Sequence, residues 1–165
     1  MTQKKYKAGM YGGKFMPMHL GHLACVRKAS ELCERVYLIL FLNGEQEADI
    51  ASHDDREMLS VESRVQQLER AAGMFTNVTP LVLDISPCRK PNGEEDWDKE
   101  TPLVLEACGK FDAVFGSEPS YAAYFERAYP WAEYVMIDPE RSETPISATM
   151  IREMKDTEEI KKWIV

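Results

Sequence analysis

The sequence predicts an α/β fold, with a doubly wound, mostly parallel sheet of five strands covered by helices on both faces. Short apolar runs alternate with segments of helical periodicity along the whole chain, and this alternation implies right-handed crossovers between parallel strands. Glycine, hydroxyl and charged residues follow several of the apolar runs directly, which is where ligands of such sheets bind. The length of 165 residues favours one domain, residues 1–165.

The first half of the chain opens with a strand, expected at Ala8 to Tyr11, directly before two glycines. A helix is expected from Leu20 to Glu34, because apolar residues recur there at helical spacing. The continuous apolar run Val36 to Leu42 is typical of a central strand that is covered on both sides. The polar stretch Glu45 to Glu57 then predicts a loop.

Ser60 is expected to cap the next helix, since its hydroxyl can accept from a free backbone amide. A third strand is expected at Val78 to Leu83. The prolines, asparagine and glycine between Ser86 and Asp96 predict a long loop. The helix after Ser60 is expected to bury one apolar face, made of Val61, Val65, Leu68 and Ala72.

The second half of the chain repeats the alternation of helix and strand. A helix is expected from about Asp98 to Cys108, and a fourth strand at Phe111 to Phe115. Residues Glu118 to Ala128 predict a helix that Pro119 interrupts early. A fifth strand is expected at Tyr134 to Ile137. The remainder, from Ser147, is expected to be helical.

The composition excludes several classes of protein. The net charge of −8 argues against a broad nucleic-acid-binding surface, although a concentrated site could still bind a small anion. The sequence has neither a signal-peptide pattern nor an apolar run long enough to span a bilayer, so a cytoplasmic protein is expected. Its four cysteines include no Cys-x-x-Cys pair, which favours buried thiols over a metal site or disulfides.

The segment from Gly12 to His22 is the most informative part of the sequence. Two glycines let a ligand approach the end of the first strand, and His19 and His22 lie three positions apart at an expected helix start. The free amides there and the two imidazoles could bind phosphate. Zinc is an alternative, but the only other histidine is His53 in a polar stretch. The expected site residues of this segment are Gly12, Gly13, Lys14, Phe15, His19, Gly21 and His22.

A second cluster lies near the end of the chain, in the segment Ile146 to Arg152. Ser147 is an expected N-cap, Thr149 falls in the first helical turn, and Arg152 follows. Hydroxyls, free amides and a guanidinium at one helix start can clamp a phosphate. A plain capped helix with a solvated arginine is the alternative interpretation of this segment by itself.

Both segments resemble signatures of the nucleotidylyltransferase superfamily. Residues 13–22 resemble its G-x-F-x-P-x-H-x-G-H signature, and residues 146–152 resemble I-S-x-T-x-x-R. The two motifs lie near opposite ends of the chain, so the resemblance frames nearly all of it. It implies a Rossmann-like sheet in which both motifs converge on the triphosphate of a bound nucleotide.

Within that superfamily, the chain looks most like the nicotinamide mononucleotide adenylyltransferases, especially the adenylyltransferase domain of the bifunctional NAD-biosynthesis regulator. Phe115 to Glu118, with Tyr121 and Tyr124, and Asp138 to Arg141 support this likeness. Gly116-Ser117-Glu118 departs from the Gly-x-Asp of many relatives, which leaves the nucleobase and ribose contacts open. The chain has no Gly-x-x-x-x-Gly-Lys-Ser/Thr loop and no DNA-binding segment before its first strand, so neither function is expected.

The resemblance implies direct in-line transfer of AMP from ATP to nicotinamide mononucleotide. His19 and His22 would contact the phosphates around the α-phosphorus, and Lys14 and Arg152 would hold the β- and γ-phosphates. Mg²⁺ would arrive with the nucleotide, because it uses few protein ligands. The remaining implied contacts are hydrogen bonds from Ser147 and Thr149, and the adenosine side formed by Gly116, Ser117 and Glu118.

Several alternatives stay open. A sister enzyme could act on phosphopantetheine, on flavin mononucleotide, or on a phosphorylated alcohol with CTP. A non-catalytic module that senses NAD or ATP is a second class, and a fragment of an aminoacyl-tRNA synthetase is a third. The sequence favours small-molecule partners and is compatible with a homo-oligomer without giving its size. Side chains that could meet the acceptor are Trp97, Trp131, Arg56, Arg64 and Arg89.

Overall fold

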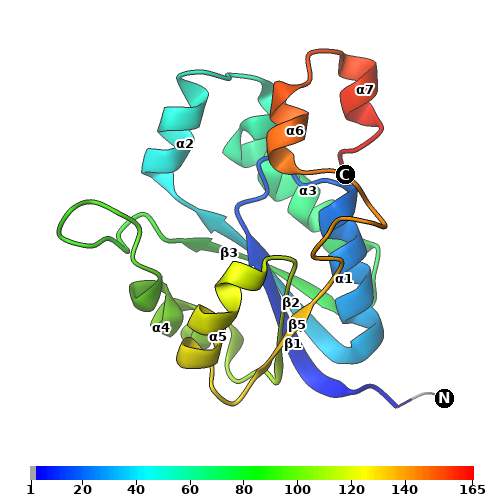
Figure 1. Ribbon diagram of the computed structural model, residues 1–165, viewed down its shortest axis with the longest axis vertical. Coiled ribbons are helices and arrows are strands. Elements are labelled where there is room, and N and C mark those ends of the chain that lie inside the picture. The colour runs from blue at the N-terminus through cyan, green and yellow to red at the C-terminus, as the bar shows by residue number, and fades with distance from the viewer. Residues whose placement is uncertain (1–2) are drawn as a thin grey trace.

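The computed structural model describes residues 3–165, so the first two residues of the predicted domain lie outside it. Its parallel strands form one five-stranded sheet in the order β3-β2-β1-β4-β5 (Figure 1). The chain runs outward from β1 to β3 and then returns to the other side of β1, which creates a switch point between β1 and β4. The predicted fold class is therefore confirmed. The strands are β1 (Tyr6–Gly13), β2 (Cys33–Leu42), β3 (Val78–Asp84), β4 (Ala113–Gly116) and β5 (Glu133–Met136).

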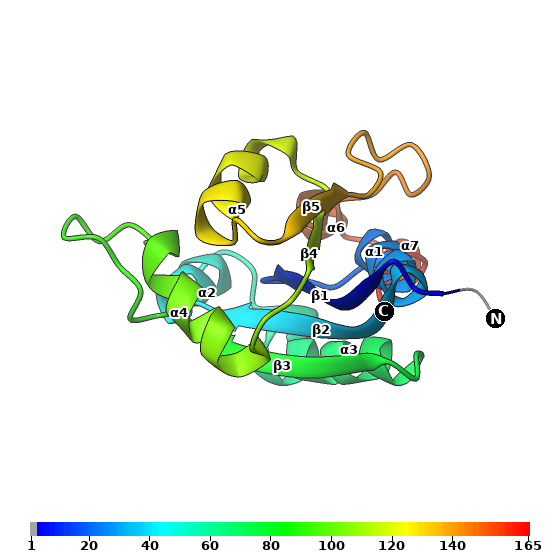
Figure 2. The same cartoon turned by 90° about the horizontal axis from the view of Figure 1, so that it is seen from below.

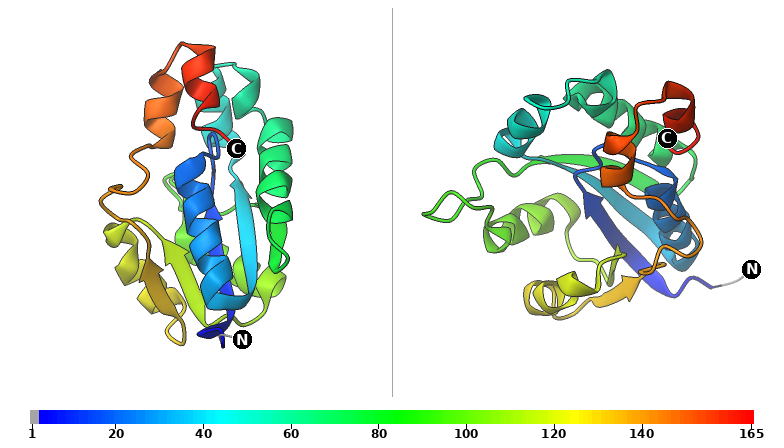
Figure 3. Two further views of the ribbon diagram at one scale, coloured as in Figure 1. Left: turned by 90° about the vertical axis from the view of Figure 1, so that its right-hand side faces the viewer. Right: turned by 45° about the horizontal axis from the view of Figure 1, so that its top comes forward.

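Helices cover both faces of the sheet (Figure 2). Helices α1 (Leu20–Leu32) and α3 (Val61–Gly73) pack side by side on one face (Figure 3, left), and α4 (Trp97–Cys108) and α5 (Ala122–Ala128) cover the other. Strand β2 shows why both faces are apolar: Leu38 and Leu40 belong to the core beneath α1 and α3, whereas Ile39 belongs to the core beneath α4. Successive side chains of a strand point to opposite faces.

The end of the chain packs against the beginning of α1. Helices α6 (Ala148–Glu153) and α7 (Thr157–Lys161) lie close together (Figure 1). Ile146, Ile151 and Ile160 form a small buried core there. The Leu20 amide donates to the Trp163 carbonyl at 2.8 Å. This contact fixes the C-terminal segment beside the residues that open α1. Among residues 3–165, no helix combines the length and the apolar character that crossing a bilayer requires.

The prediction of a loop from Glu45 to Glu57 is wrong. Most of it forms helix α2 (Gly44–Ala51) and the 3₁₀ helix η1 (Glu57–Leu59). Asn43 caps α2, because its side chain accepts from the Gln46 amide at 3.3 Å and its amide donates to Glu47 at 3.0 Å. The helix has no buried apolar face, since none of its residues is fully buried, and apolar periodicity is the signal that predicts a helix.

Other predicted boundaries also shift. Strand β1 extends to Gly13, so Gly12 and Gly13 lie inside the strand, paired with Ile39 and Leu40 of β2. Helix α1 ends at Leu32 rather than Glu34, and residues 119–121 form a 3₁₀ helix, η2 (Pro119–Tyr121), before α5. Residues 154–156 separate α6 from α7, so the chain after Ser147 is not one helix. The other predicted strands, and the Ser60 cap of α3, are confirmed.

Candidate active site

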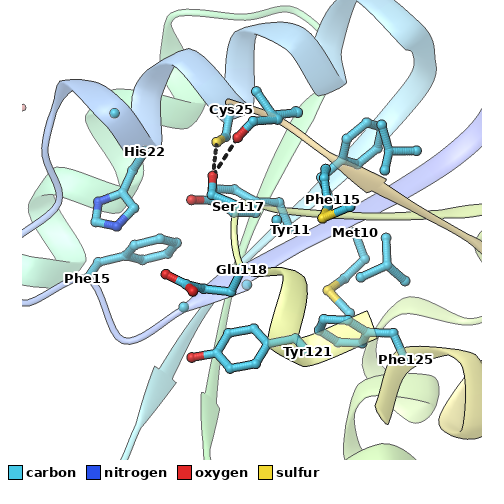
Figure 4. Close-up of a pocket in the computed structure, with 18 of the residues that line it drawn as sticks. Met10, Tyr11, Phe15, His22, Cys25, Phe115, Ser117, Glu118, Tyr121 and Phe125 are labelled. Carbon is cyan, nitrogen blue, oxygen red and sulfur yellow. Dashed lines mark hydrogen bonds between the residues drawn. The ribbon is translucent and has the colours of Figure 1, made fainter. Parts of the chain in front are cut away.

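A cavity of about 850 Å³ opens at the carboxyl ends of β1 and β4, the switch point of the sheet. Figure 4 shows Phe15, His22, Glu118 and Tyr121 facing it. The structure brings ten of the thirteen predicted site residues into its lining. These are Gly12, Gly13, Lys14, Phe15, His19, Gly21, His22, Gly116, Ser117 and Glu118.

His19 and His22 form a stacked pair at the start of α1. Their ring centroids are 3.7 Å apart and the rings are inclined by 26°. The Gly21 amide donates to His19 Nδ1 at 3.0 Å, and the His19 amide donates to His22 Nδ1 at 3.1 Å. Each Nδ1 atom therefore acts as an acceptor, which leaves the proton of a neutral ring on Nε2. The backbone thus sets both rings as hydrogen-bond donors.

Both imidazoles are neutral near pH 7. Burial, with a smaller effect from the Arg141 charge, lowers the pKa of His19 to about 4. Burial also lowers the pKa of His22 well below its usual range, and the neighbouring His19 and Arg141 lower it further. Neutral imidazoles can donate to a phosphate oxygen without first losing or gaining a proton. This suits a phosphoryl-type reaction that needs charge stabilisation more than proton transfer.

The glycines of the first motif keep space for the rings. A Cβ atom on Gly21 would lie 2.8 Å from His19 Cε1, and one on Gly13 would lie 2.8 Å from Phe15 Cε1. Contacts this short would displace the ring in each case. Phe15 itself packs edge-on against His22, with ring centroids 4.8 Å apart. The two glycines therefore serve the placement of His19 and Phe15.

Two buried polar side chains of α3 hold the turn that carries the motif. Arg64 donates to the Lys14 carbonyl from Nη2 at 2.8 Å, and Gln67 accepts from the Met18 amide at 3.1 Å. Both side chains are almost fully buried, whereas the predicted core residue Val61 is 41 % exposed. The prediction for this helix face is wrong at Val61, because polar residues that bind backbone occupy the buried side. Apolar patterning carries no signal for such residues.

The second motif lies beside the cavity but outside its lining. Ser147 caps α6 by accepting from the Met150 amide at 3.1 Å. Arg152 donates to the Met16 carbonyl at 2.7 Å and to the Thr149 hydroxyl at 3.3 Å. Ser147, Thr149 and Arg152 were expected to clamp a triphosphate, and in this structure none of the three lines the cavity. Of the three, Arg152 contacts the turn of the first motif, through the Met16 carbonyl.

The ends of β4 and β5 form the opposite wall. The Ser117 hydroxyl donates to the Ile137 carbonyl at 2.8 Å and lies 3.4 Å from Cys25 Sγ (Figure 4). Glu118 pairs with Arg141, 3.5 Å away, and Arg141 also donates to the Ile146 carbonyl at 2.7 Å. Only the resemblance to the superfamily had pointed to Arg141. It lines the cavity and is the cation that acts on both histidines.

Lys14 pairs with Glu95 at the other end of the cavity, where Glu100 also lies. Its Nζ atom lies 2.6 Å from Glu95 Oε1, which also accepts from Asn43 at 3.1 Å. Burial and the neighbouring charge of Glu95 raise the pKa of Glu100 to about 8. Burial pushes the pKa of Glu95 upward, but the hydrogen bond and charge of Lys14 bring it below its usual range. The sequence did not predict that Glu95 and Glu100 lie together, because Glu95 is in a loop and Glu100 is on a helix.

Of the side chains that were expected to meet the acceptor, only one lines the cavity. Trp97 lines the cavity, next to Tyr121 and Tyr124, whereas Trp131 donates to the Phe111 carbonyl and lies elsewhere. None of the three candidate arginines lines the cavity. They bind protein groups instead: Arg56 pairs with Asp54, Arg64 with Glu47, and Arg89 with Glu45.

A family model described as cytidylyltransferase-like matches residues 10–154, most of the chain. The chain belongs to the cytidylyltransferase-like family. It is thereby a member of the nucleotidylyltransferase superfamily, as the two motifs predicted. The match includes both the His19–His22 pair and Arg152, so the hydrogen bond from Arg152 to Met16 joins two distant parts of the matched region.

Curated relatives of this cytidylyltransferase-like chain match about half of it. The phosphopantetheine adenylyltransferase of Streptococcus pneumoniae (strain Taiwan19F-14) is 33 % identical over 86 residues, 48 % of each chain. That of Streptococcus agalactiae (serotype Ia) is 36 % identical over 76 residues, 46 % of this chain and 42 % of the relative. The chain thus aligns with about half the length of the curated relatives it matches.

Solved structures match the fold over nearly the whole chain. A NadR protein in complex with NR has a TM-score of 0.67 and 22 % identity, covering 99 % of this chain and 43 % of the other. A bifunctional NMN adenylyltransferase/ADP ribose pyrophosphatase from Francisella tularensis has a TM-score of 0.62 and 20 % identity, covering 90 % and 41 %. At these identities, the likeness establishes a shared fold.

Proposed function

We propose that this protein transfers AMP from ATP to the phosphate of nicotinamide mononucleotide, giving NAD and pyrophosphate. A phosphate oxygen of the acceptor attacks the α-phosphorus of ATP, and the bond from that phosphorus to the bridging oxygen of the β-phosphate breaks. The electron pair leaves with pyrophosphate. The protein supplies positioning and charge stabilisation and forms no covalent bond in this scheme.

The observation that carries this proposal is the backbone-fixed pair of His19 and His22. Both Nδ1 atoms accept backbone hydrogen bonds, so two Nε2–H donors are held at the start of α1 without a cost of reorganisation during the reaction. Negative charge that develops on the phosphoryl oxygens would be stabilised by such donors. Lys14 and Arg141 line the same cavity and add positive charge.

The acceptor is assigned from the aromatic side chains around Trp97, which line the cavity. Gly116 to Glu118 are proposed to face adenosine, which leaves Trp97 and its neighbours to the acceptor. Flat aromatic faces suit a nicotinamide ring. Phosphopantetheine, the acceptor in the names of the curated relatives, contains no aromatic ring. The NadR and NMN adenylyltransferase folds agree with this choice.

Magnesium is proposed to enter with ATP. Among residues 3–165, no group of three or more His, Cys, Asp or Glu side chains gathers to hold a metal ion. Mg²⁺ commonly keeps several waters and binds substrate phosphates with few protein ligands. When bound, it would neutralise phosphate charge, and the residues described above would orient the nucleotide.

The test is to incubate the protein with magnesium-ATP and one acceptor at a time, and to follow pyrophosphate. The acceptors are nicotinamide mononucleotide, nicotinic acid mononucleotide, phosphopantetheine, flavin mononucleotide and, with CTP, a phosphorylated alcohol. Release with a nicotinamide-type mononucleotide supports the proposal. Release only with another acceptor would contradict the assignment of nicotinamide mononucleotide and indicate a sister activity. ATP or NAD binding with no release from any acceptor would favour the sensing module.

A further inference from the structure

Arg141 lies near the start of α1, although it belongs to the loop after β5. Its Nη1 atom donates to the Ile146 carbonyl at 2.7 Å. The Ile146 side chain lies beside Gly21, since a Cβ atom on Gly21 would be 3.7 Å from Ile146 Cγ2, and Gly21 stands between His19 and His22. The guanidinium of Arg141 is therefore held near the histidine pair, and its charge lowers the pKa of both imidazoles.

The loop that carries Arg141 is fixed by the carboxylate of Asp138. This carboxylate accepts from three backbone amides at 2.7, 2.9 and 3.2 Å, those of Ser142, Glu143 and Thr144. Asp138 and Arg141 both have positive φ angles, of 47° and 55°, which cost free energy in residues other than glycine. Such a backbone persists only where its surroundings determine it, so the Arg141 side chain starts from a fixed point.

Arg141 is held by its partner carboxylate more loosely than Lys14 is. Lys14 Nζ lies 2.6 Å from Glu95 Oε1, and the two side chains are 30 % and 16 % exposed. Arg141 Nη2 lies 3.5 Å from Glu118 Oε1, and these side chains are 40 % and 47 % exposed. A long ion pair that water screens contributes little to stability. Arg141 can therefore exchange Glu118 for a phosphate more easily than Lys14 can leave Glu95.

The other cations of the first α-helix and of the second motif are placed less well. Arg27 and Lys28 line the cavity, but they follow His22 by more than one turn of α1. Arg152, which was expected to hold phosphate, does not line the cavity. Within residues 3–165, Arg141 is thus the lining cation best placed to meet a phosphate at the histidine pair.

We propose that Arg141 binds the reacting phosphate beside the histidine pair, and that Glu118 is the carboxylate which this phosphate displaces. The inference rests on the proposed function and adds to it a catalytic residue and a competitor built into the site. Arg141 keeps its bond from Nη1 to Ile146 and turns Nη2 from Glu118 to a phosphate oxygen. The fork of the guanidinium serves both acceptors at once, and its charge stabilises the negative charge that leaves with pyrophosphate.

The experiment measures the binding of magnesium pyrophosphate by isothermal titration calorimetry. Pyrophosphate carries neither the base nor the ribose that Glu118 is proposed to face, so its affinity reports the phosphate contacts alone. Arg141→Met should weaken this binding by about tenfold or more, because a charged hydrogen bond is lost. Glu118→Gln should tighten it by about two- to fivefold, because the competing carboxylate loses its charge.

The opposite signs separate competition from structural support. If Glu118 only held Arg141 in its working position, Glu118→Gln would weaken pyrophosphate binding. Glu140→Gln is the matched control, because Glu140 is an exposed acid directly before Arg141 and does not line the cavity. It removes the same charge, and its pyrophosphate affinity should stay close to that of the wild type.

Three results overturn the inference: an unchanged affinity in Arg141→Met, equal or weaker binding in Glu118→Gln, and failure of the wild type to bind pyrophosphate. If circular dichroism shows that Arg141→Met does not fold, Arg141→Lys takes its place. Lysine keeps the charge but has no fork to serve Ile146 and a phosphate together, so pyrophosphate binding should again weaken.

Turnover separates this inference from the proposed function. The kcat for nicotinamide mononucleotide with magnesium-ATP should fall by about 100-fold or more in Arg141→Met. The expected changes in pyrophosphate affinity, without turnover of any acceptor by the wild type, would keep Arg141 as a phosphate ligand and remove the adenylyl transfer. Wild-type turnover in Arg141→Met would keep the transfer and remove the catalytic role of Arg141.

Discussion

Arg152 donates a hydrogen bond of 2.7 Å from Nη1 to the carbonyl oxygen of Met16, which lies 136 positions earlier in the chain. The contact joins α6 to the turn that ends in the His19–His22 pair. Because an arginine carries a full charge, such a bond is stronger than one between neutral groups. The relationship gives Arg152 a structural task in addition to its proposed contact with ATP phosphates.

Replacing Arg152 by alanine should therefore affect two measurements. The free energy of unfolding in urea should fall by about 1–3 kcal/mol, because the Met16 carbonyl loses a charged donor. The KM for ATP should rise, since the turn and the proposed phosphate contact are both disturbed. Lys155→Ala is the control, because Lys155 is exposed in the segment that follows α6. Wild-type stability in Arg152→Ala would show that the contact is unimportant.

Loss of the His22 ring should reduce turnover far more than binding. His22→Ala is expected to lower kcat by roughly 100- to 1000-fold, the usual effect of removing one donor to a transition state. Pyrophosphate release under saturating substrates measures it. His53→Ala should behave as wild type, because His53 is exposed and does not line the cavity. Near-normal turnover in His22→Ala would take the histidine pair out of the proposed mechanism.

The sequence could predict the strand end and the histidine pair of this site, but not the buried side chains that hold them in place. Alternating apolar runs predicted the strand that ends in Gly12 and Gly13, and motif spacing predicted the His19–His22 pair. These features are local, and their physical causes repeat in many proteins. Arg64 and Gln67 carry no comparable signal, because each is buried only through a partner that the fold brings from about 50 positions away.

Glu95 and Glu100 escaped prediction for a related reason. Glu95 follows the glycine of a long polar loop, and Glu100 lies within a charged helical turn, where acidic residues are ordinarily solvated. Only the fold shows that Glu100 is buried and that Lys14 approaches Glu95. Asp138 to Arg141 were noticed through the resemblance, but the place of Arg141 in the cavity likewise depends on the loop after β5.

A methyl group on Gly21 should disturb the His19 ring directly. In Gly21→Ala the new Cβ would lie 2.8 Å from His19 Cε1, so the ring must move from its hydrogen bond with the residue 21 amide. We expect turnover to fall by about tenfold or more, since displaced donors lose most of their effect. Gly73→Ala is the control, because its Cβ would meet nothing within 4 Å. Unchanged turnover in Gly21→Ala would show that the ring position is not critical.

Removal of Arg64 should destabilise the whole protein. Its side chain is fully buried, pairs with Glu47 at 3.0 Å and donates to the Lys14 carbonyl. In Arg64→Ala both partners lose their donor, which should lower the free energy of unfolding by about 3–5 kcal/mol. Urea denaturation measures this change. Arg35→Ala, at an exposed position of β2, should change it by less than about 0.5 kcal/mol, and a similarly small change in Arg64→Ala would contradict the prediction.

His19 and Glu100 should both make stability depend on pH, because folding shifts their pKa values in opposite directions. The pKa of His19 falls from 6.5 to about 4 on folding, so its contribution to stability is lost as the pH drops below 6.5 towards 4. The pKa of Glu100 rises from 4.5 to about 8 on folding. The unfolded chain then gives up a proton that the folded chain keeps, so stability decreases as the pH rises from 4.5 towards 8 and levels off above that.

Glu100→Gln isolates the second effect. The glutamine side chain is similar in shape but has no proton to lose, so the variant should lack the decline between pH 4.5 and about 8. Its free energy of unfolding, measured in urea at several pH values, should overtake that of the wild type within this range. The neighbouring charged groups Glu95, Lys14 and Asp96 are present in both proteins. Parallel curves for the two proteins would mean that Glu100 ionises alike when folded and unfolded, and the argument for a buried, protonated Glu100 carboxyl group would fail.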